Sequence, residues 1–325
     1  KEKTDFWANN AINYVYSIAY KCYKEREKGI GTLAHVIAFA LSDSDLVFRW
    51  LSEDPEIALN MSSMLTAWRL GAQQQTAGAV SSAQTPLVLL NNKYIFWVLS
   101  PLPEEEFSLD ITNREHPTLL CIGNAPSIKE AVSPPISCIA SVIMSQMNNP
   151  GKQKSIFMVD EFPTINLQNI DVFIGTARKH YVATILALQD DNQAVRDYGK
   201  DSAKILKASC GTQAFGMTGN DTTAKEVESL FGEMKEAQES FSHQDSGNSS
   251  TTESLQKDKI VKARDVAGQS VGHFIGKIAD GNPPFFNAQF NMCKFMEKEI
   301  PPFSLPVSFG AAEYRDKEIE IMEEI

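Results

Sequence analysis

The chain has 325 residues and a mass of 36.0 kDa, so it can bury the core of one large domain or of two. An apolar share of 43% and a charged share of 22% exclude a disordered or membrane-embedded composition, and no apolar run approaches the roughly 20 residues that span a bilayer. The net charge of −11 excludes a globally basic duplex-DNA clamp, so any DNA contact must come from a local patch or from a channel formed on assembly.

The first hundred residues are predicted to be mostly helical. Apolar residues recur at three- and four-residue spacing across residues 6–22, as on one face of a helix. Thr32 is a candidate N-cap of a second helix, and the pair Asp54 and Pro55 begins a long helix that we expect to continue for about 25 residues. Residues 93–100 are rich in aromatic and β-branched residues, so we predict a short strand there.

From about residue 107 onward, short apolar runs alternate with amphipathic segments. The predicted strands are residues 118–123, 155–159, 182–188, 210–217, 270–278 and 285–293, and the predicted helices are residues 134–147, 167–180, 192–207 and 221–232. This alternation indicates an α/β fold with a doubly wound, mostly parallel sheet that helices cover on both faces. Sheets of this kind bind ligands at the C-terminal ends of their strands.

Two segments depart from this alternation. Residues 235–259 are rich in Ser and Thr and nearly free of apolar residues, so we interpret them as a mobile insertion in the sheet. Residues 311–325 are predicted to form an acidic helical tail. The five cysteines are scattered and form no C-x-x-C pair, which argues against a disulfide framework and against a zinc site.

The segment KSIFMVDEFPTI, residues 154–165, carries the first indication of catalysis. Asp160 and Glu161 directly follow a short apolar strand, and an ionised carboxylate at such a place must be solvated, paired or bound to a metal. In RecA-like nucleoside triphosphatases the first acid of such a pair holds the water shell of Mg²⁺, and the second polarises the attacking water. The alternative is that both acids cap the next helix.

Two more positions extend this pattern. Gln189 ends the next strand, where its amide can contact both a γ-phosphate and the attacking water if the two strands are neighbours. Arg178 lies late in the intervening helix and can be offered to the phosphates of a neighbouring subunit. The alternatives are a loop glutamine and a cation that stabilises the negative end of its helix.

Taken together, the segments FMVDEFPTI, TARKHYVATILALQDDNQAVRDYG and ASCGTQAFGMTGNDTTAKEVESLFGE resemble the TraG/TraD family of type IV secretion coupling proteins. These are hexameric DNA-pumping ATPases of bacterial conjugation, and the similarity is greatest to the forms carried by Bacteroides-type mobile elements. DFWANNAINYVYSIAY resembles the start of the family's all-α domain, and VGHFIGKIADGNPPFFNAQF resembles its last strands. The resemblance therefore covers nearly the whole chain.

The resemblance implies a fold, a set of roles and a set of partners. Residues 1–100 would be the all-α domain that recognises the relaxosome and its DNA substrate, and residues 101–310 the C-terminal part of a RecA-like motor domain. Asp160 would hold Mg²⁺ through water, Glu161 would be the catalytic glutamate, Gln189 the phosphate sensor and Arg178 the arginine acting in trans. The full-length protein would use ATP and Mg²⁺ as a homo-hexamer that passes relaxase-bound single-stranded DNA to a type IV secretion channel.

The chain departs from the family pattern in one respect, because it contains no phosphate-binding loop of the form G-x-x-x-x-G-K-[ST]. None of the three Gly-Lys pairs, at residues 151–152, 199–200 and 276–277, fits this pattern. In the family the loop and the membrane helices precede the all-α domain. Since the chain starts at Lys1 and not at Met, we expect a soluble, monomeric fragment of a protein on the cytoplasmic face of the inner membrane, with little ATP hydrolysis of its own.

Two other interpretations stay open. The chain can be a non-catalytic docking module of the conjugation machinery, built on a motor fold that lost its loop. It can also belong to another DNA-translocating or pilus-assembly ATPase of the same superfamily. The complete set of Asp160, Glu161, Arg178 and Gln189 disfavours the first alternative, and the helical segment before the acid pair disfavours the second.

Overall fold

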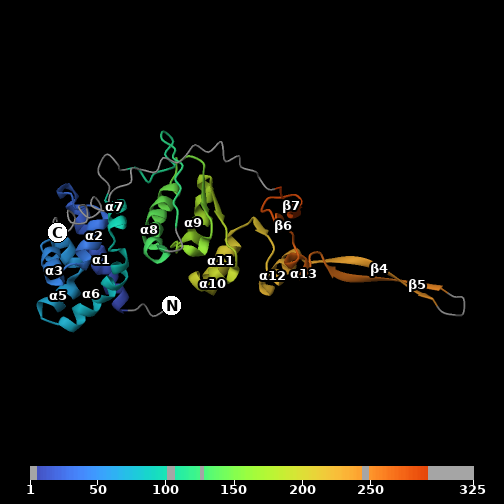
Figure 1. Ribbon diagram of the computed structural model, residues 1–325, viewed down its shortest axis with the longest axis horizontal. Helices are drawn as coiled ribbons and strands as arrows, with labels where there is room; N and C mark the ends of the chain where they lie inside the picture. The colour runs from blue at the N-terminus through green and yellow to red at the C-terminus, as the bar shows by residue number, and fades with distance from the viewer. Residues whose placement is uncertain (1–5, 101–106, 125–127, 244–248, 292–325) are drawn as a thin grey trace. The chain divides into compact units, whose positions relative to one another are not determined.

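The computed structural model describes residues 6–100, 107–124, 128–243 and 249–291, which divide into two compact units (Figure 1). The first unit contains the described residues up to Leu109 and those among 121–136, and the second contains residues 110–120 and the described residues from Ser137 onward. The predicted helical tail at 311–325 lies outside the described residues. No helix in the described ranges is both long and apolar enough to cross a bilayer.

The regular elements of the first unit are all helices in the described residues. Its elements are α1 (Phe6–Lys24), η1 (Arg26–Lys28), α2 (Leu33–Leu41), α3 (Ser44–Ser52), α4 (Pro55–Asn60), α5 (Ser62–Arg69), α6 (Gln73–Leu87), η2 (Val88–Leu90) and α7 (Lys93–Leu99). Two predicted N-caps are present. The Thr32 side chain accepts a hydrogen bond from the backbone N–H of His35, and Asp54 accepts from the N–H groups of Glu56 and Ile57.

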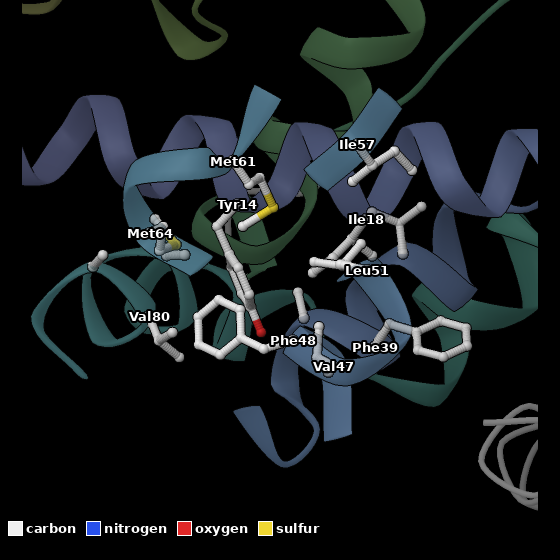
Figure 2. Packing of buried hydrophobic residues seen from close by; sticks show 14 of the residues in the cluster. Tyr14, Ile18, Phe39, Val47, Phe48, Leu51, Ile57, Met61, Met64 and Val80 are labelled. Carbon is white, nitrogen blue, oxygen red and sulfur yellow. The ribbon is translucent and has the colours of Figure 1, made fainter. Parts of the chain in front are cut away.

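The core of this unit forms around α1 (Figure 2). Tyr14 and Ile18 of α1 are fully buried, and they pack with Phe48 and Leu51 of α3. The ring centroids of Tyr14 and Phe48 lie 5.7 Å apart. Figure 2 labels both side chains within this cluster. Full burial of a side chain such as Leu51 contributes roughly 2 kcal/mol to the stability of the fold. Helices as short as these are unstable in isolation, so their packing in this cluster is what stabilises them.

Two predictions for this unit are wrong. The long helix expected from residue 55 is interrupted at Met61 and again at Gly71, whose φ of 71° is left-handed, so the segment forms α4, α5 and α6. Residues 93–100 contain the helix α7 and no strand. Phe96 of α7 is fully buried in a cluster with Ile37 and Ala38 of α2, and this packing outweighs the β-propensity of its sequence.

The second unit alternates strands and helices. The helix α8 (Lys129–Met147) contains residues of both units, and the following elements are β1 (Ser155–Val159), η4 (Phe162–Thr164), α9 (Ile170–Ala177), η5 (Arg178–His180), β2 (Val182–Leu186), α10 (Asp191–Tyr198), α11 (Lys200–Ser209), β3 (Gln213–Phe215), α12 (Asp221–Phe231), β4 (Glu233–His243), β5 (Ser249–Lys259), α13 (Ala263–Ala267), β6 (His273–Lys277) and β7 (Phe285–Gln289). With one exception, each strand and helix predicted from the alternation is present: β1 has the predicted ends, residues 192–207 fall in the two helices α10 and α11, and the other elements have shifted ends.

The exception is the strand predicted at residues 118–123, which is irregular. Leu119 is 90% exposed, and the N–H of Thr118 donates to the carbonyl of Ile111 instead of to a neighbouring strand. A buried strand of a parallel sheet requires partners on both edges, and no described strand pairs with this segment. The segment therefore forms no strand with any described part of the chain, although its apolar sequence favours one.

The strands β1 and β2 form a parallel pair, in register from Ser155 opposite Val182 to Val159 opposite Leu186. One face packs on α9, where the rings of Phe157 and Phe173 lie 5.5 Å apart. The other face is open, because Ile156 and Met158 are 64% and 65% exposed. In the described residues this is the parallel part of the predicted sheet.

The remaining strands are antiparallel. The strand β6 lies between β3 and β7, and β4 pairs with β5 over eleven residue pairs in a separate two-stranded ribbon (Figure 1). The polar segment 235–259, which we interpreted as a mobile insertion, thus forms most of a β-hairpin. Its Thr residues favour strands, and each strand provides the backbone hydrogen-bond partners of the other. Whether this hairpin moves stays a prediction.

Candidate functional site

The parallel pair places the predicted acids and the predicted glutamine at the same edge of the sheet. Asp160 and Glu161 follow β1 directly, and Gln189 follows β2 after two further residues. Because the strands are parallel and in register, their carboxyl ends meet. The side-chain amide of Gln189 donates a hydrogen bond to Glu161 Oε1, with an N–O distance of 2.8 Å. The sequence-based expectation that Gln189 lies beside the acid pair is thereby confirmed.

The backbone at Glu161 has an unusual conformation. Its φ of 48° and ψ of 49° are left-handed, which costs a non-glycine residue roughly 1–2 kcal/mol. Three hydrogen bonds fix this turn. Glu161 N–H donates to Asp160 Oδ1 at 3.0 Å, Phe162 N–H donates to the carbonyl of Ala187 at 2.8 Å, and Ala187 N–H donates to the carbonyl of Val159 at 2.9 Å. Strain that the surroundings hold in place is a common property of functional sites.

Both carboxylates are exposed to solvent, so each can remain ionised without a buried counter-ion. The Glu161 N–H donates to Oδ1 of Asp160, whose side chain is exposed. Mg²⁺ typically keeps several waters and binds through one or two carboxylates together with substrate phosphates. The described residues contain no cluster of three or more potential metal ligands, and a single exposed aspartate fits a Mg²⁺ held largely by water and phosphate.

A polar cavity of about 500 Å³ opens at the end of β2. It is lined by Gln189, Asp190, Asn192, Met217, Thr218, Gly219, Asn220 and Asp221. Asp190 caps α10 and accepts a second bond from the Asn220 amide at 2.9 Å. The N–H of Asn192 and, after it, the amide of Asn220 lower the pKa of the Asp190 carboxyl. An anionic residue thus lies directly beside Gln189.

Arg178 is not part of this constellation. It begins η5 at the N-terminal end of β2, whereas the acid pair and Gln189 lie beyond the C-terminal ends of the strands. The length of β2 and its extension, about 20 Å at 3.3 Å per residue, separates the two places. The Arg178 side chain is exposed. The structure therefore brings together three of the four predicted site residues and leaves the arginine at the opposite edge.

Sequence reasoning missed the residues that support the site from α10 and α12. The Tyr198 hydroxyl bonds to the backbone of the turn that follows the acid pair, and Asn220 links the start of α12 to Asp190. Asn220 precedes an amphipathic helix, so its capping role was visible in the sequence. Nothing in the local sequence of Tyr198 indicated a partner more than 30 positions away.

The family model described as type IV secretory system conjugative DNA transfer matches residues 1–262. No curated protein matches the chain significantly. Among solved structures, the bacterial conjugative coupling protein TrwBdeltaN70 in its unbound monoclinic form aligns with a TM-score of 0.68 at 16% identity, over 91% of this chain and 65% of that one.

Two further structures of the plasmid coupling protein TrwB contain nucleotide. The complex with ADP and Mg²⁺ aligns with a TM-score of 0.67, and the complex with the non-hydrolysable analogue ADPNP aligns with 0.66, each at 16% identity and over 91% of this chain. At this identity the alignments establish a shared fold, which confirms the RecA-like α/β class with an N-terminal helical region. The chain spans about two thirds of the length of these solved chains, 65% and 66% respectively.

Proposed function

Since the chain belongs to the type IV secretory system conjugative DNA transfer family, we propose that it is the all-α region and part of the motor of a coupling ATPase. In this proposal a hexamer uses ATP hydrolysis to deliver relaxase-bound single-stranded DNA to a type IV secretion channel at the inner membrane. The observation that carries the proposal is the bond of 2.8 Å between Gln189 and Glu161 at the C-terminal edge of a parallel strand pair.

The proposal gives each of the three clustered residues a role, and their geometry supports it. Glu161 is exposed and ionisable, so its carboxylate can orient and polarise a water for attack on the γ-phosphate. Gln189 holds that carboxylate through one amide hydrogen and retains a second for a phosphate oxygen or the water. Asp160 would hold Mg²⁺ through its water shell, and the ion would neutralise charge on the phosphates.

We place the phosphate-binding loop outside residues 1–325, because no Gly-Lys pair in the chain fits its pattern. The open face of the strand pair supports this placement. Parallel strands in α/β proteins are normally covered on both faces, yet Ile156 and Met158 are largely exposed on one face. The proposal is that further chain of the motor covers this face, and that the 325-residue chain alone hydrolyses ATP poorly.

Arg178 takes part from a neighbouring subunit in this proposal. Its exposed position at the opposite edge of the sheet prevents it from reaching the acid pair of its own subunit. An arginine presented to the nucleotide of the next protomer in a ring can stabilise the charge that develops on the transferred phosphate. The all-α unit, in turn, would receive the relaxosome and its DNA.

The test uses the longer natural protein that includes the phosphate-binding loop. Glu161→Gln should retain ATP binding and lower kcat for ATP hydrolysis by at least about 100-fold, because it removes the base but keeps the shape of the side chain. Glu130→Gln, which alters an exposed acid on α8, is the matched control and should leave kcat unchanged. Normal hydrolysis and normal DNA transfer by Glu161→Gln would remove Glu161 from the mechanism.

The trans role of Arg178 has its own test in the same protein. Arg178→Ala should abolish turnover, and mixing it with Glu161→Gln protomers should restore part of the activity. In such mixed rings some interfaces combine an intact Arg178 with an intact Glu161. If no mixture recovers activity, the assignment of Arg178 to the neighbouring site is wrong.

A further inference from the structure

The turn that follows the acid pair is attached to α10 by one tyrosine. The Tyr198 hydroxyl donates a hydrogen bond to the carbonyl of Ile165 at 2.7 Å and accepts one from the N–H of Leu167 at 2.9 Å. The ring of Tyr198 also stacks on that of Phe162, with centroids 4.6 Å apart and planes at 20°. One side chain therefore contacts both the start and the end of this turn.

This attachment has a direct relation to Glu161. Phe162 directly follows Glu161 in the chain, and its buried ring stacks on Tyr198. It therefore connects the strained backbone of Glu161 to Tyr198. A left-handed conformation at a non-glycine residue persists only when neighbouring contacts impose it. The bonds at Ile165 and Leu167 close the other end of the turn, so the backbone has little freedom to relax.

The helix α10 connects this attachment to Gln189. Asp190 caps the N-terminus of α10 directly after Gln189, and Tyr198 is the last residue of the helix. Eight helical residues span about 12 Å and behave as a rigid rod over that length. The chain on either side of α10 thus contacts the same segment: Gln189, which precedes the N-cap Asp190, bonds to Glu161, and Tyr198, the last helical residue, bonds to Ile165 and Leu167.

The Tyr198 hydroxyl is a constant donor. Burial raises its pKa to about 12, an effect that the Leu167 N–H partly offsets and the Asp197 charge reinforces. The hydroxyl therefore stays protonated at any physiological pH, and the bond to Ile165 is always available. No redistribution of protons within the site would release it.

We propose that Tyr198 is a positioning residue for the hydrolysis reaction: its hydroxyl bridge to Ile165 and Leu167 holds the turn so that the Glu161 carboxylate meets Gln189. This inference rests on the proposed function, because it assumes that Glu161 acts on the attacking water. The competing explanation is that Tyr198 contributes only ring packing on Phe162. The two differ at the hydroxyl, which packing does not require.

The experiment compares three variants of the longer protein with its phosphate-binding loop. Tyr198→Phe keeps the ring and removes both hydrogen bonds, Tyr198→Ala removes both features, and Tyr181→Phe alters an exposed tyrosine of the same unit as the control. We expect Tyr198→Phe to lower kcat about 10-fold or more while KM for ATP changes less than about 2-fold, since in this inference the turn orients Glu161 for the reaction and does not hold ATP. Tyr198→Ala should be at least as impaired, and Tyr181→Phe should match the wild type.

Circular dichroism at the assay temperature establishes that each variant is folded before its kinetics are read. A wild-type kcat in folded Tyr198→Phe would overturn the inference alone, and so would a loss confined to KM. A loss of kcat in Tyr198→Ala with none in Tyr198→Phe would assign the residue to packing. A wild-type protein without ATPase activity would overturn the proposed function and this inference with it.

Discussion

Replacing Glu161 by glycine and by alanine tests the strained turn independently of any catalysis. In the 325-residue chain, the left-handed conformation at φ 48° costs a residue with a Cβ roughly 1–2 kcal/mol, whereas glycine adopts it freely. Glycine also loses more conformational entropy on folding, by about 0.5–1 kcal/mol. Both variants lose the hydrogen bond to Gln189 equally, so that loss cancels in the comparison. The relief of strain exceeds the entropy cost of glycine, and we therefore expect Glu161→Gly to be more stable than Glu161→Ala by about 0.5–1 kcal/mol.

The control is the same pair of substitutions at Gln193, within the right-handed helix α10. There the order should invert, with Gln193→Gly less stable than Gln193→Ala by about 0.5–1 kcal/mol. The inversion of sign separates backbone strain from a general preference for glycine or alanine. It also makes the comparison insensitive to the absolute stability of the chain.

The assay is urea unfolding followed by two signals. All four tryptophans (Trp7, Trp50, Trp68 and Trp97) lie in the first unit, so their fluorescence reports that unit, whereas far-UV circular dichroism reports both. The expected shift should therefore appear in the dichroism signal and leave the fluorescence transition unchanged. If Glu161→Gly is equal to or less stable than Glu161→Ala, the left-handed backbone at this position is not a strained feature of the folded chain.

Two further outcomes follow from the contacts of single residues. Leu51→Ala should destabilise the first unit by about 2–5 kcal/mol because Leu51 is fully buried. The control Leu59→Ala, at a leucine that is 74% exposed, should cost less than about 0.5 kcal/mol. Equal costs in fluorescence-monitored unfolding would contradict the assignment of Leu51 to the core. Hydrogen bonds from the N–H of Asn192 and then from the Asn220 amide lower the pKa of Asp190 below its ordinary 3.8, so their stabilisation is present above about pH 4 and is lost as the pH falls through the folded pKa. Asn220→Ala should therefore cost less as the pH is lowered from 6 through the folded pKa, and a pH-independent cost in dichroism-monitored urea unfolding would exclude this linkage.

Most local features of the fold could be predicted from the sequence. The caps at Thr32 and Asp54 and the strand that ends at Val159 depend on residues within a few positions of one another. Short-range hydrogen bonds and side-chain periodicity determine such features, so residues close together in the sequence are enough to predict them. The error at residues 93–100 had the opposite origin, because Phe96 packs on a helix about 60 positions earlier.

The candidate site divides in the same way. The acid pair and Gln189 were identified because each follows an apolar strand, and parallel pairing then brings their side chains together. Arg178 was also identified, but only the structure places it at the other edge of the sheet. Tyr198 was missed, since its partners Ile165 and Leu167 are more than 30 positions away.

The sequence by itself thus determined the family and the helical and α/β regions, and it supplied the residues that we propose act on a nucleotide, because motifs and local periodicity indicate all of these. The tertiary structure alone decided the left-handed turn at Glu161, the bond from Gln189 and the support from Tyr198. Each of these requires two segments to approach within hydrogen-bond distance. That approach depends on how strands pair and helices pack, which local sequence does not specify.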